Sequence, residues 1–358
     1  MQQYSLFTED LDHVLDLTRD AWDDLRGKRI FITGGTGFFG MWLLESFLWA
    51  NERLDLDAQA VVLSRDPQSF IKKHTHLADA PALSFHQGDV RNFAFPDGNF
   101  AFIIHAAAEA SARLIAEQPL LMLDAIINGT RRALDFARHC GAQRFLLTSS
   151  GAVYGRQPPE LAHVGEDYPG APDPMDPASC YGLAKRLAEH QAMLYARRYG
   201  IEAKIARCFA FAGPYLPLDT HFAVGNFVRD ALRGGPIRIS GDGTPRRSYL
   251  YAADLAVWLW TILFRGQSCR PYNVGAERAV SISELAYIVA GAFQEHIAVE
   301  IARTATPGDH PQQYVPSTRR AQTELGLNAT ITIEAAVARM ARWHSQQGAI
   351  PCQLQSAI

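Results

Sequence analysis

Short apolar runs alternate with helix-forming segments through the first 207 residues of the chain. Runs rich in β-branched and aromatic residues predict strands, whereas longer segments with apolar positions three and four residues apart predict helices. The predicted strands are 28–33, 60–63, 101–105, 144–149 and 202–207, and the predicted helices are 38–50, 126–138 and 181–199. Because these mostly apolar strands alternate with helices, we expect an α/β fold with a doubly wound parallel sheet covered on both faces.

The second half of the chain is less regular than the first. Segments rich in Pro and Gly begin near Gly213 and recur at 234–245 and 307–316, where they interrupt the alternation. We therefore expect a second, smaller domain that is partly interleaved with the first. The predicted division is a helical extension at 1–26, a first domain at 27–206 with part of 248–276, and a second domain at 207–247 and 277–345.

Composition and charge narrow the range of partners. The chain has 358 residues, of which 48% are hydrophobic, and this is enough for a large buried core. Its net charge of -3 provides no basic field, so neither nucleic acid nor an anionic membrane surface is expected as a partner. The longest apolar stretch, 255–264, has about half the length that a bilayer span needs, so no membrane segment is expected.

The start of the chain and its cysteines bear on the compartment. Residues 1–20 are acidic and amphipathic and lack the basic start and apolar run of a signal peptide. The five cysteines are scattered, odd in number and without a CxxC pair, which is typical of reduced thiols that serve as small buried hydrophobes. We therefore expect a cytoplasmic protein without a metal site.

A glycine-rich loop follows the first predicted strand. Residues 33–40 read TGGTGFFG, in which Gly34, Gly37 and Gly40 lie between a strand and a helix. One glycine allows a tight turn, one lets the backbone approach a pyrophosphate, and one lets the helix pack close to the sheet. The helix N-terminus adds free N–H groups and the positive end of its dipole, so the loop predicts a Rossmann-type fold that binds a dinucleotide. The other loop residues expected at the cofactor are Thr36, Phe38 and Phe39.

The residues after the second predicted strand bear on which dinucleotide is bound. NAD enzymes usually place an acid there for the ribose hydroxyls, but this chain has Ser64 followed by Arg65. Because an arginine can pair with the 2′-phosphate of NADP, NADP is favoured over NAD. The alternative is that Arg65 is an exposed loop charge and that Asp66 holds the ribose. After a later short strand, Asp89 and Val90 suit either a contact to the adenine or an ordinary turn.

Tyr181 and Lys185 lie on one face of a predicted helix in the pattern Y-x-x-x-K. A nearby ammonium favours the phenolate, so the tyrosine can exchange a proton with a hydroxyl while hydride moves to or from a nicotinamide. The lysine can also bond the nicotinamide ribose. Ser149 and Ser150 end an apolar strand at the edge where open α/β sheets bind ligands, and a serine there can bond the reacting oxygen. Each signal alone also fits a surface pair or a strand-end cap, but together they predict an oxidoreductase site.

With these motifs in this order, the chain resembles the extended short-chain dehydrogenases/reductases, and among them the NAD-dependent epimerase/dehydratase family of sugar-nucleotide enzymes. The resemblance extends from about Gly27 to about Arg342. The matching segments are TGGTGFFG, GDV at 88–90, HAAAEAS at 105–111, NGT at 128–130, SSGAVYG at 149–155, YGLAK at 181–185, RCFAFAGP at 207–214, GDGTPRRSYLYAADLA at 241–256, YNVG at 272–275 and PGD at 307–309.

The resemblance implies roles for individual residues. Ser150 would be the catalytic hydroxyl, Tyr181 the acid/base and Lys185 its partner. Arg247 would contact the substrate pyrophosphate, and Asn226 would lie near the nucleotide. The other residues expected at the cofactor are Ala106, Ala107, Ala108 and Asn128, and those expected at the substrate are Glu109, Ser111 and Tyr154. The family also implies a sugar-nucleotide substrate and a homodimer formed through the helices near 128–140 and 181–199.

Two positions depart from the family pattern around the substrate phosphates. Ala210 stands where many relatives carry an asparagine, so one polar contact to the nucleotide is missing or is made by another group. Thr306 stands where many carry an arginine, so the phosphate clamp would depend more on Arg246 and Arg247.

The segment between the catalytic serine and Tyr154 separates the reactions of the family. The 4,6-dehydratases resemble one another in placing an Asp-Glu pair there, and the sugar-acid decarboxylases place a Glu, whereas this chain has Gly151 and Ala152. Eliminating water needs an acid and a base at the carbons concerned. Glu109 is a carboxylate in another loop and a weak substitute, so a dehydratase ranks third among the expected functions.

Three other functions are considered together with the dehydratase. A 4-ketosugar reductase that consumes NADPH comes first, because it needs only the serine, the tyrosine and the lysine and would use Arg65. A 4-epimerase that retains NAD comes almost level, because SSGAVYG resembles the epimerases. A non-catalytic protein that senses dinucleotide comes last, because this chain keeps a serine, a tyrosine and a lysine for proton transfer, which a sensor does not need.

Overall fold

The computed structural model describes residues 4–107, 117–220 and 222–348. Ala108, Glu109 and Ser111, which the sequence predicts at the ligands, lie outside these residues. The chain divides into two compact units, which we describe separately. The first unit comprises Met1–Gly155, Gly170–Cys208 and Ala256–Tyr272, and the second comprises Arg156–Pro169, Phe209–Leu255 and Asn273–Ile358.

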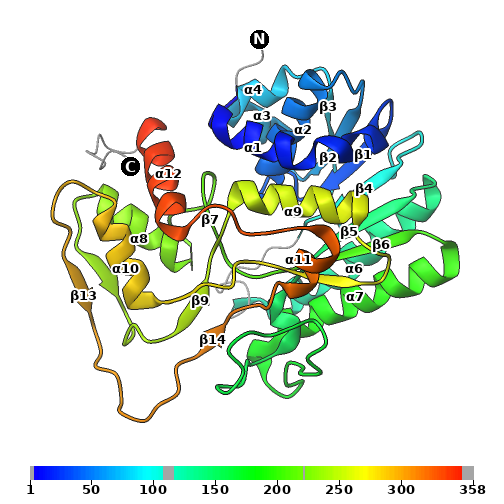
Figure 1. Ribbon diagram of the computed structural model, residues 1–358. Helices are drawn as coiled ribbons and strands as arrows, with labels where there is room; N and C mark the ends of the chain where they lie inside the picture. Colours follow the sequence, from blue (N-terminus) through cyan, green and yellow to red (C-terminus); the bar gives the residue numbers. More distant parts are fainter. Residues whose placement is uncertain (1–3, 108–116, 221, 349–358) are drawn as a thin grey trace. The chain divides into compact units, whose positions relative to one another are not determined.

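The first unit is built on a sheet of seven strands in the order β11-β6-β5-β4-β1-β2-β3 (Figure 1). The pairings from β6 through to β3 are all parallel, so the predicted doubly wound parallel sheet is confirmed. The strands are β1 (Arg29–Thr33), β2 (Gln59–Ser64), β3 (Leu83–Gln87), β4 (Phe102–His105), β5 (Arg144–Ser150), β6 (Glu202–Cys208) and β11 (Pro271–Val274). The strand order reverses between β1 and β4, and ligands of open α/β sheets bind at the carboxyl ends of the strands at such a point.

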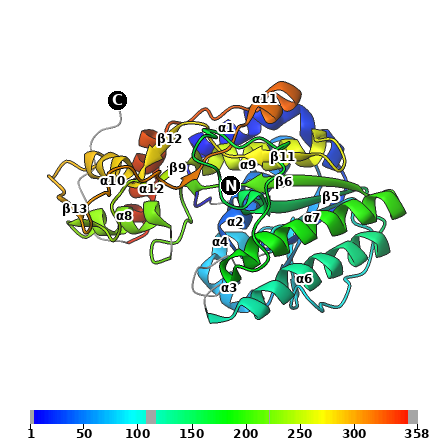
Figure 2. The same ribbon diagram turned by 90° about the horizontal axis from the view of Figure 1, so that it is seen from below.

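Helices cover both faces of this sheet. The helices are α1 (Thr8–Thr18), η1 (Arg19–Leu25), α2 (Phe38–Arg53), α3 (Pro67–Lys73), α4 (Thr75–Ala78), α6 (Pro119–His139), η2 (Gly151–Tyr154), η3 (Pro177–Ser179), α7 (Cys180–Tyr199) and α9 (Ala252–Arg265). Helices α6 and α7 lie side by side, with α9 on the opposite side of β5 and β6 (Figure 2). The apolar cluster under α6 and α7 includes Phe31, Phe136 and Phe145. Such burial on both faces explains the apolar strands of the sequence.

The N-terminal segment is tied to the first unit by buried contacts. The Trp22 ring lies 4.6 Å from that of Trp260 on α9, measured between centroids. The buried Glu45 carboxylate on α2 accepts hydrogen bonds from the backbone N–H groups of Ser5 and Leu6, at 3.0 and 2.9 Å. Because α1 and α9 both contact α2, that helix is buried on every side from Gly40 to Ala50.

The second unit consists of short strands and helices. Its elements are β7 (Phe211–Ala212), α8 (Ala223–Leu232), β8 (Ile237–Ile239), β9 (Arg246–Ser248), β10 (Leu250–Tyr251), β12 (Ala279–Ser281), α10 (Ile282–Gly291), β13 (Val299–Ile301), β14 (Gln313–Tyr314), α11 (Arg319–Leu325) and α12 (Ile333–Gln346). The strands form three small sheets, β12-β9-β14, β13-β8 and β10-β7. The middle strand β9 holds Arg247 between Val280 of β12 and Tyr314 of β14.

One helix is longer than its apolar pattern predicts. We expected a helix at 126–138, whereas α6 begins at Pro119, which occupies the first turn. Proline is favoured there because its missing N–H has no partner in a first turn. Leu120 and Leu121 follow it and are 78% and 43% exposed, so they break the amphipathic pattern that indicates the rest of the helix.

Candidate functional site

The glycine-rich loop forms a close turn between β1 and α2. Gly34 has a φ of +73°, and a Cβ atom there would lie 2.5 Å from the carbonyl group of Ala106. A Cβ atom on Gly40 would lie 2.3 Å from the backbone of Gly35, so the first turn of α2 packs directly on the loop. Gly37 is the residue before α2 and has no side chain, so a pyrophosphate could approach the N-terminus of that helix closely. The loop therefore fits a dinucleotide.

The residues after β4 lie beside this loop. The N–H of Ala106 donates to the carbonyl oxygen of Thr33 at 3.1 Å, and that of Ala107 donates to the Thr33 hydroxyl at 3.3 Å. These contacts bring two of the residues predicted at the cofactor next to Gly34. Val90 and Asn128, which were also predicted there, belong to the neighbouring segment after β3 and to α6. Val90 packs within 3.0 Å of the position that a Cβ on Gly129 would occupy.

Two loops that follow β2 and β3 are joined at the edge of the sheet. The N–H of Gly88 donates to the carbonyl oxygen of Ser64 at 2.9 Å. The Arg91 guanidinium bonds both carboxylate oxygens of Asp89, at 2.8 and 2.9 Å, and this lowers the pKa of the Asp89 carboxyl. The charge of Arg65 lowers that pKa as well. The exposed Asp66 accepts the N–H of Ser69 at 3.0 Å and thereby caps α3.

The catalytic residues predicted from the sequence come from β5 and α7. Ser150 ends β5, is buried, and accepts the N–H of Ala152 at 3.1 Å. The Lys185 Nζ donates to the carbonyl oxygen of Thr148 at 2.8 Å and lies 5.9 Å from the centre of the Tyr181 ring. Burial lowers the pKa of the Lys185 ammonium to about 8, although the charges of Cys208 and Glu189 raise it.

Close packing holds α7 against the segment that contains Ser150. A Cβ atom on Gly182 would lie 2.5 Å from the carbonyl oxygen of Ala152, so the glycine after the tyrosine lets the helix approach η2. The Arg186 side chain donates to the carbonyl oxygen of Val153 at 2.9 Å. The helix face with Tyr181 and Lys185 is thus set at a fixed distance from the end of β5. This arrangement can hold a substrate oxygen and exchange a proton with it.

Tyr154, which the sequence predicts at the substrate, lies in a buried network. Its hydroxyl accepts a hydrogen bond from Arg207 at 2.9 Å, and the residue is 2% exposed. The predicted contact with substrate stays a prediction. Arg207 also bonds Glu189, and neither residue was singled out from the sequence. The sequence signal available was the position of Glu189 four residues after Lys185, on the same face of α7.

A buried histidine lies beneath the cofactor loop. The His105 ring is hydrogen-bonded between the hydroxyls of Thr33, at 2.8 Å from Nδ1, and Thr130, at 3.1 Å from Nε2. Burial, helped by the charge of Lys185, lowers the pKa of His105 from 6.5 to about 3. The imidazole is therefore neutral in the folded protein at pH 7.

The pKa of His105 predicts an acid-dependent loss of stability. Between about pH 3 and 6.5 the unfolded chain binds a proton at this position that the folded protein does not. The free energy of unfolding therefore decreases as the pH falls through that range. In His105→Gln this decrease should be smaller, measured by urea unfolding at a series of pH values, and His190→Gln at an exposed histidine should match the wild type. Equal pH dependence in both variants would contradict the assignment.

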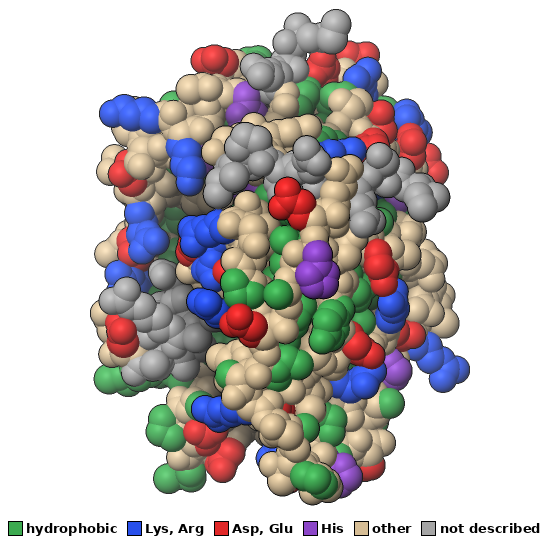
Figure 3. Space-filling model, turned by 90° about the vertical axis from the view of Figure 1, so that its left-hand side faces the viewer, with side chains coloured by type: hydrophobic (Ala, Val, Ile, Leu, Met, Phe, Trp, Pro, Cys, Tyr) green, Lys and Arg blue, Asp and Glu red, His purple; other side chains and the backbone are tan. Residues whose placement is uncertain are grey.

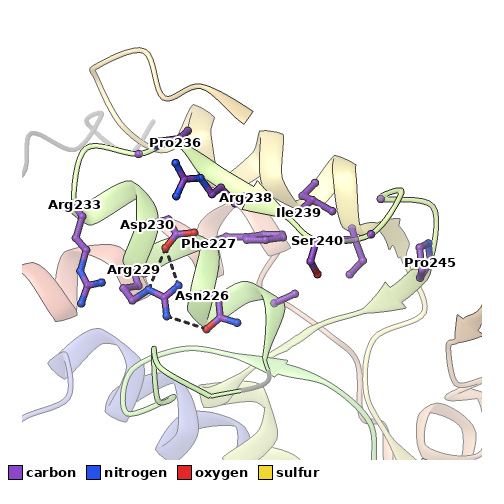
Figure 4. Close-up of a pocket in the computed structure, with 15 residues that line it drawn as sticks. Asn226, Phe227, Arg229, Asp230, Arg233, Pro236, Arg238, Ile239, Ser240 and Pro245 are labelled. Atoms are coloured by element: carbon purple, nitrogen blue, oxygen red, sulfur yellow. Dashed lines mark hydrogen bonds and ion pairs between the residues drawn. The ribbon is translucent and has the colours of Figure 1, made fainter. Parts of the chain in front are cut away.

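The second unit holds the residues predicted at the nucleotide. A pocket of about 700 Å³ lies between α8 and the strand β8, with Asn226 among its lining residues. Figure 4 shows Arg229 bonded to Asp230 and Asn226 on the helix side and Arg238 on the strand side. Arg233 also lines the pocket. Arg229 also pairs with Asp219 and Arg238 with Glu300, each at 3.1 Å, so an anionic ligand at these arginines would compete with their carboxylate partners.

Arg247 lies in β9 of the same unit. Its Nη1 donates to the carbonyl oxygens of Arg246, at 2.9 Å, and Gln312, at 3.4 Å. Its guanidinium lies 5.8 Å from the centre of the Tyr314 ring. Burial lowers the pKa of Arg247 because it separates the guanidinium charge from water. A negatively charged group of a ligand would stabilise that charge.

Among the described residues no group of His, Cys, Asp and Glu side chains could hold a metal ion. Within the same ranges no helix is long and apolar enough to cross a membrane. Figure 3 shows acidic and basic side chains interspersed on the face that it draws, as the net charge of -3 would suggest.

Comparison with known proteins gives this site a context. The profile of the NAD dependent epimerase/dehydratase family matches residues 30–275. Two curated relatives from Arabidopsis thaliana are each 30% identical to this chain. UDP-glucuronic acid decarboxylase 1 is matched over 87% of this chain and 68% of its own length, and UDP-glucuronic acid decarboxylase 6 over 85% of each.

Solved structures are similar over nearly their whole length. A dTDP-glucose 4,6-dehydratase from Streptomyces venezuelae with NAD and TYD bound is 25% identical, with a TM-score of 0.73 over 90% of this chain and 99% of that chain. A UDP-glucose 4-epimerase from Thermotoga maritima is 19% identical, with a TM-score of 0.71 over 89% and 99%. The second comparison shows a common fold and no more.

Proposed function

Because this chain belongs to the NAD-dependent epimerase/dehydratase family, we propose that it moves hydride between a nicotinamide dinucleotide and a ring carbon of a sugar nucleotide, with C4 the expected carbon. The family resemblance drawn from the motifs is confirmed by the family profile and the 30% identical relatives. Within the family we propose an NDP-4-ketosugar reductase that uses NADPH.

The observation that carries this proposal is the segment that follows Ser150. It forms η2, packed against the helix of Tyr181 and Lys185, and its first two residues are Gly151 and Ala152. These side chains have no acid or base to offer at the neighbouring carbons of a sugar. The serine, tyrosine and lysine alone suffice for hydride transfer at a carbon that bears oxygen.

The proposed chemistry assigns one task to each residue. When bound, the dinucleotide supplies hydride to the carbon or accepts hydride from it. Tyr181 gives a proton to the reacting oxygen in the reduction, and Ser150 bonds the same oxygen and orients it. Lys185 keeps a positive charge near the phenol and binds the nicotinamide ribose. The glycines of the loop hold the pyrophosphate against the N-terminus of α2.

The curated relatives suggest which nucleotides to test first. They are named for UDP-glucuronic acid, so we propose a nucleoside diphosphate sugar as the substrate and offer uridine compounds first. We place the nucleoside in the pocket with Asn226 and the pyrophosphate at Arg247. Purified enzyme should oxidise NADPH when a 4-ketosugar nucleotide is added. Release of carbon dioxide from UDP-glucuronic acid would instead place decarboxylation first, and no turnover with any sugar nucleotide would leave a dinucleotide sensor.

A 4-epimerase is the second candidate. The segment SSGAVYG resembles the epimerases, and one related structure, at 25% identity, holds NAD. An epimerase oxidises and then reduces the same carbon, so it retains its dinucleotide and consumes none. Mass spectrometry of the purified protein separates the two candidates, because the epimerase should carry bound NAD and interconvert two sugar nucleotides without added dinucleotide.

The charges after β2 and β3 support NADP over NAD. Asp66 is engaged as the cap of α3, and both oxygens of Asp89 are bonded to Arg91. The ion pair with Arg91 neutralises the charge of Asp89, and the cap of α3 uses one of the two carboxylate oxygens of Asp66. The exposed Arg65 can pair with a 2′-phosphate.

Replacing Arg65 should test this preference. The wild type should bind NADP about tenfold more tightly than NAD, because a hydrogen bond to a charged group contributes roughly 1.5 kcal/mol or more. Arg65→Ala should lose most of that difference in titration calorimetry and keep its turnover at saturating dinucleotide. Lys72→Ala, at an exposed position on α3, should keep the difference. Tighter binding of NAD than of NADP by the wild type would overturn the proposal and put the epimerase first.

The predicted homodimer is supported by exposed apolar residues on α6 and α7. The residues concerned are Leu120, Leu121, Leu187, Leu194 and Tyr199, which are 41% to 78% exposed. A second copy that packs on these helices would remove this apolar surface from water. We retain the homodimer and the cytoplasmic location as proposals.

A further inference from the structure

A buried ion pair lies between α7 and β6 in the first unit. The Arg207 guanidinium holds the Glu189 carboxylate with two hydrogen bonds, 2.9 Å from Nε to Oε1 and 2.7 Å from Nη2 to Oε2. The two side chains are 15% and 12% exposed. A bidentate pair of this kind fixes both the distance and the angle between the groups that carry it.

The ion pair is hydrogen-bonded to residues that lie before and after the catalytic serine in the sequence. The Ser149 hydroxyl donates to Glu189 Oε1 at 2.5 Å, immediately before Ser150 in β5. Arg207 Nη1 donates to the Tyr154 hydroxyl at 2.9 Å, at the end of the η2 segment that begins after Ser150. Ser149 also faces Arg207 in the register of β5 and β6. The backbone around Ser150 is therefore held before and after the serine.

One member of the ion pair, Glu189, lies on the same helix as the other two catalytic residues. Tyr181, Lys185 and Glu189 follow one another at intervals of four residues and share a face of the helix. The Lys185 Nζ is held by the carbonyl oxygen of Thr148, next to Ser149 in the strand. One set of hydrogen bonds thus joins the helix of the acid/base to the strand of the catalytic hydroxyl.

We propose that Glu189 and Arg207 are positioning residues, which hold α7, β5 and η2 in the register that places Tyr181 and Lys185 opposite Ser150. The proposal rests on the hydride-transfer function proposed above. Neither residue needs to touch the substrate, because each acts through the backbone and the side chains that it binds. A small displacement of a reacting group is enough to slow an oriented reaction by about 10²-fold.

A purely structural role would give a different result. The chain offers a matched pair at the other end of β5, where Arg144 Nη1 and Asp24 Oδ2 lie 2.6 Å apart and are 21% and 28% exposed. That pair ties the same strand to the N-terminal segment, away from Ser150. Loss of either pair should lower the melting temperature, but only loss of the Glu189 pair should alter the catalytic groups.

The experiment compares Glu189→Gln, Ser149→Ala and Asp24→Asn in the full chain. Glu189→Gln keeps the shape and removes the charge, and Ser149→Ala removes the link to β5 while the ion pair remains, should the first variant fold poorly. Glu189→Gln and Ser149→Ala should each lower kcat measurably, by up to about 10²-fold, with KM little changed. Asp24→Asn should keep the wild-type kcat. Arg207→Lys keeps the positive charge but should still lower kcat, because lysine cannot form the bidentate pair with Glu189.

A second readout does not need turnover. The Lys185 amine is titrated by NMR on protein with isotopically labelled lysine; the groups whose charges act on it include Glu189 and Cys208, and His105 lies close by. Glu189→Gln should lower the pKa of Lys185 through the loss of charge alone. Ser149→Ala keeps that charge and breaks only the hydrogen bond between β5 and Glu189, so a changed Lys185 titration in Ser149→Ala reports a displacement of α7 against β5. Asp24→Asn should leave the titration unchanged. The inference is overturned if both the Lys185 titration and kcat are unchanged in Ser149→Ala. If the wild type shows no turnover, the proposed function fails and the Lys185 titration of Ser149→Ala alone decides the inference.

Discussion

Tyr181→Phe should reduce turnover by about two to four orders of magnitude, the usual contribution of a positioned acid or base. The variant lacks only the phenolic oxygen, and the ring can still pack beside Lys185, whose Nζ lies 5.9 Å from the ring centre. Folding and dinucleotide binding should therefore persist. Steady-state rates with NADPH and a 4-ketosugar nucleotide measure the effect, and calorimetry measures the dinucleotide affinity.

A second tyrosine on the same helix provides the control. The Tyr195 hydroxyl donates to Asp135 at 2.5 Å, and it lies fourteen residues after Tyr181 on α7. Tyr195→Phe should lose that hydrogen bond and keep the wild-type rate. If Tyr181→Phe also keeps a near-normal rate, Tyr181 is not the acid/base and the role carried over from the family is wrong.

Arg247→Ala should weaken the binding of the sugar nucleotide by about ten- to a hundredfold, because hydrogen bonds from a charged group to a phosphate contribute roughly 1.5–3 kcal/mol. The β9 backbone on both sides of Arg247 is paired with β12 and β14, so the strand should survive the loss of the side chain. Dinucleotide affinity should stay nearly unchanged. Titration calorimetry with a UDP-sugar and with NADP compares the two ligands directly.

A surface arginine of the same unit controls for loss of charge. Arg278 pairs with Glu334 at 2.7 Å, and their side chains are 61% and 48% exposed. Arg278→Ala removes one positive charge and should leave both affinities unchanged. Equal losses for the sugar nucleotide and the dinucleotide in Arg247→Ala would remove Arg247 from the substrate site.

Much of the first unit was predictable because its signals are local. The glycine loop has a strand before it and a helix after it, and β1 and α2 begin within one residue of the predicted positions. The strands β1, β2, β4 and β5 are buried along almost their whole length, so apolar runs reveal them, whereas β3 is only partly buried and its sequence is mixed. The strand end at Ser150 and the helix with Tyr181 and Lys185 were likewise visible in the sequence.

The parts that were missed depend on contacts between distant residues. Glu189 and Arg207 lie on different elements and pair only because β6 lies beside β5, which no local pattern records. The strands of the second unit have two or three residues, too few to show a period of two. The role of Asp66 as the cap of α3 also appears only once that helix is known to begin at Pro67.

Transfer of a labelled hydride tests the central claim most directly. The enzyme is incubated with a 4-ketosugar nucleotide and NADPH that carries deuterium on the transferred position of the nicotinamide ring. Mass spectrometry and NMR of the product should find one deuterium on a ring carbon of the sugar, at C4, and Tyr181→Phe should slow its appearance about a hundredfold or more. An enzyme that binds dinucleotide but transfers no deuterium to any sugar nucleotide, in either direction, would contradict the account.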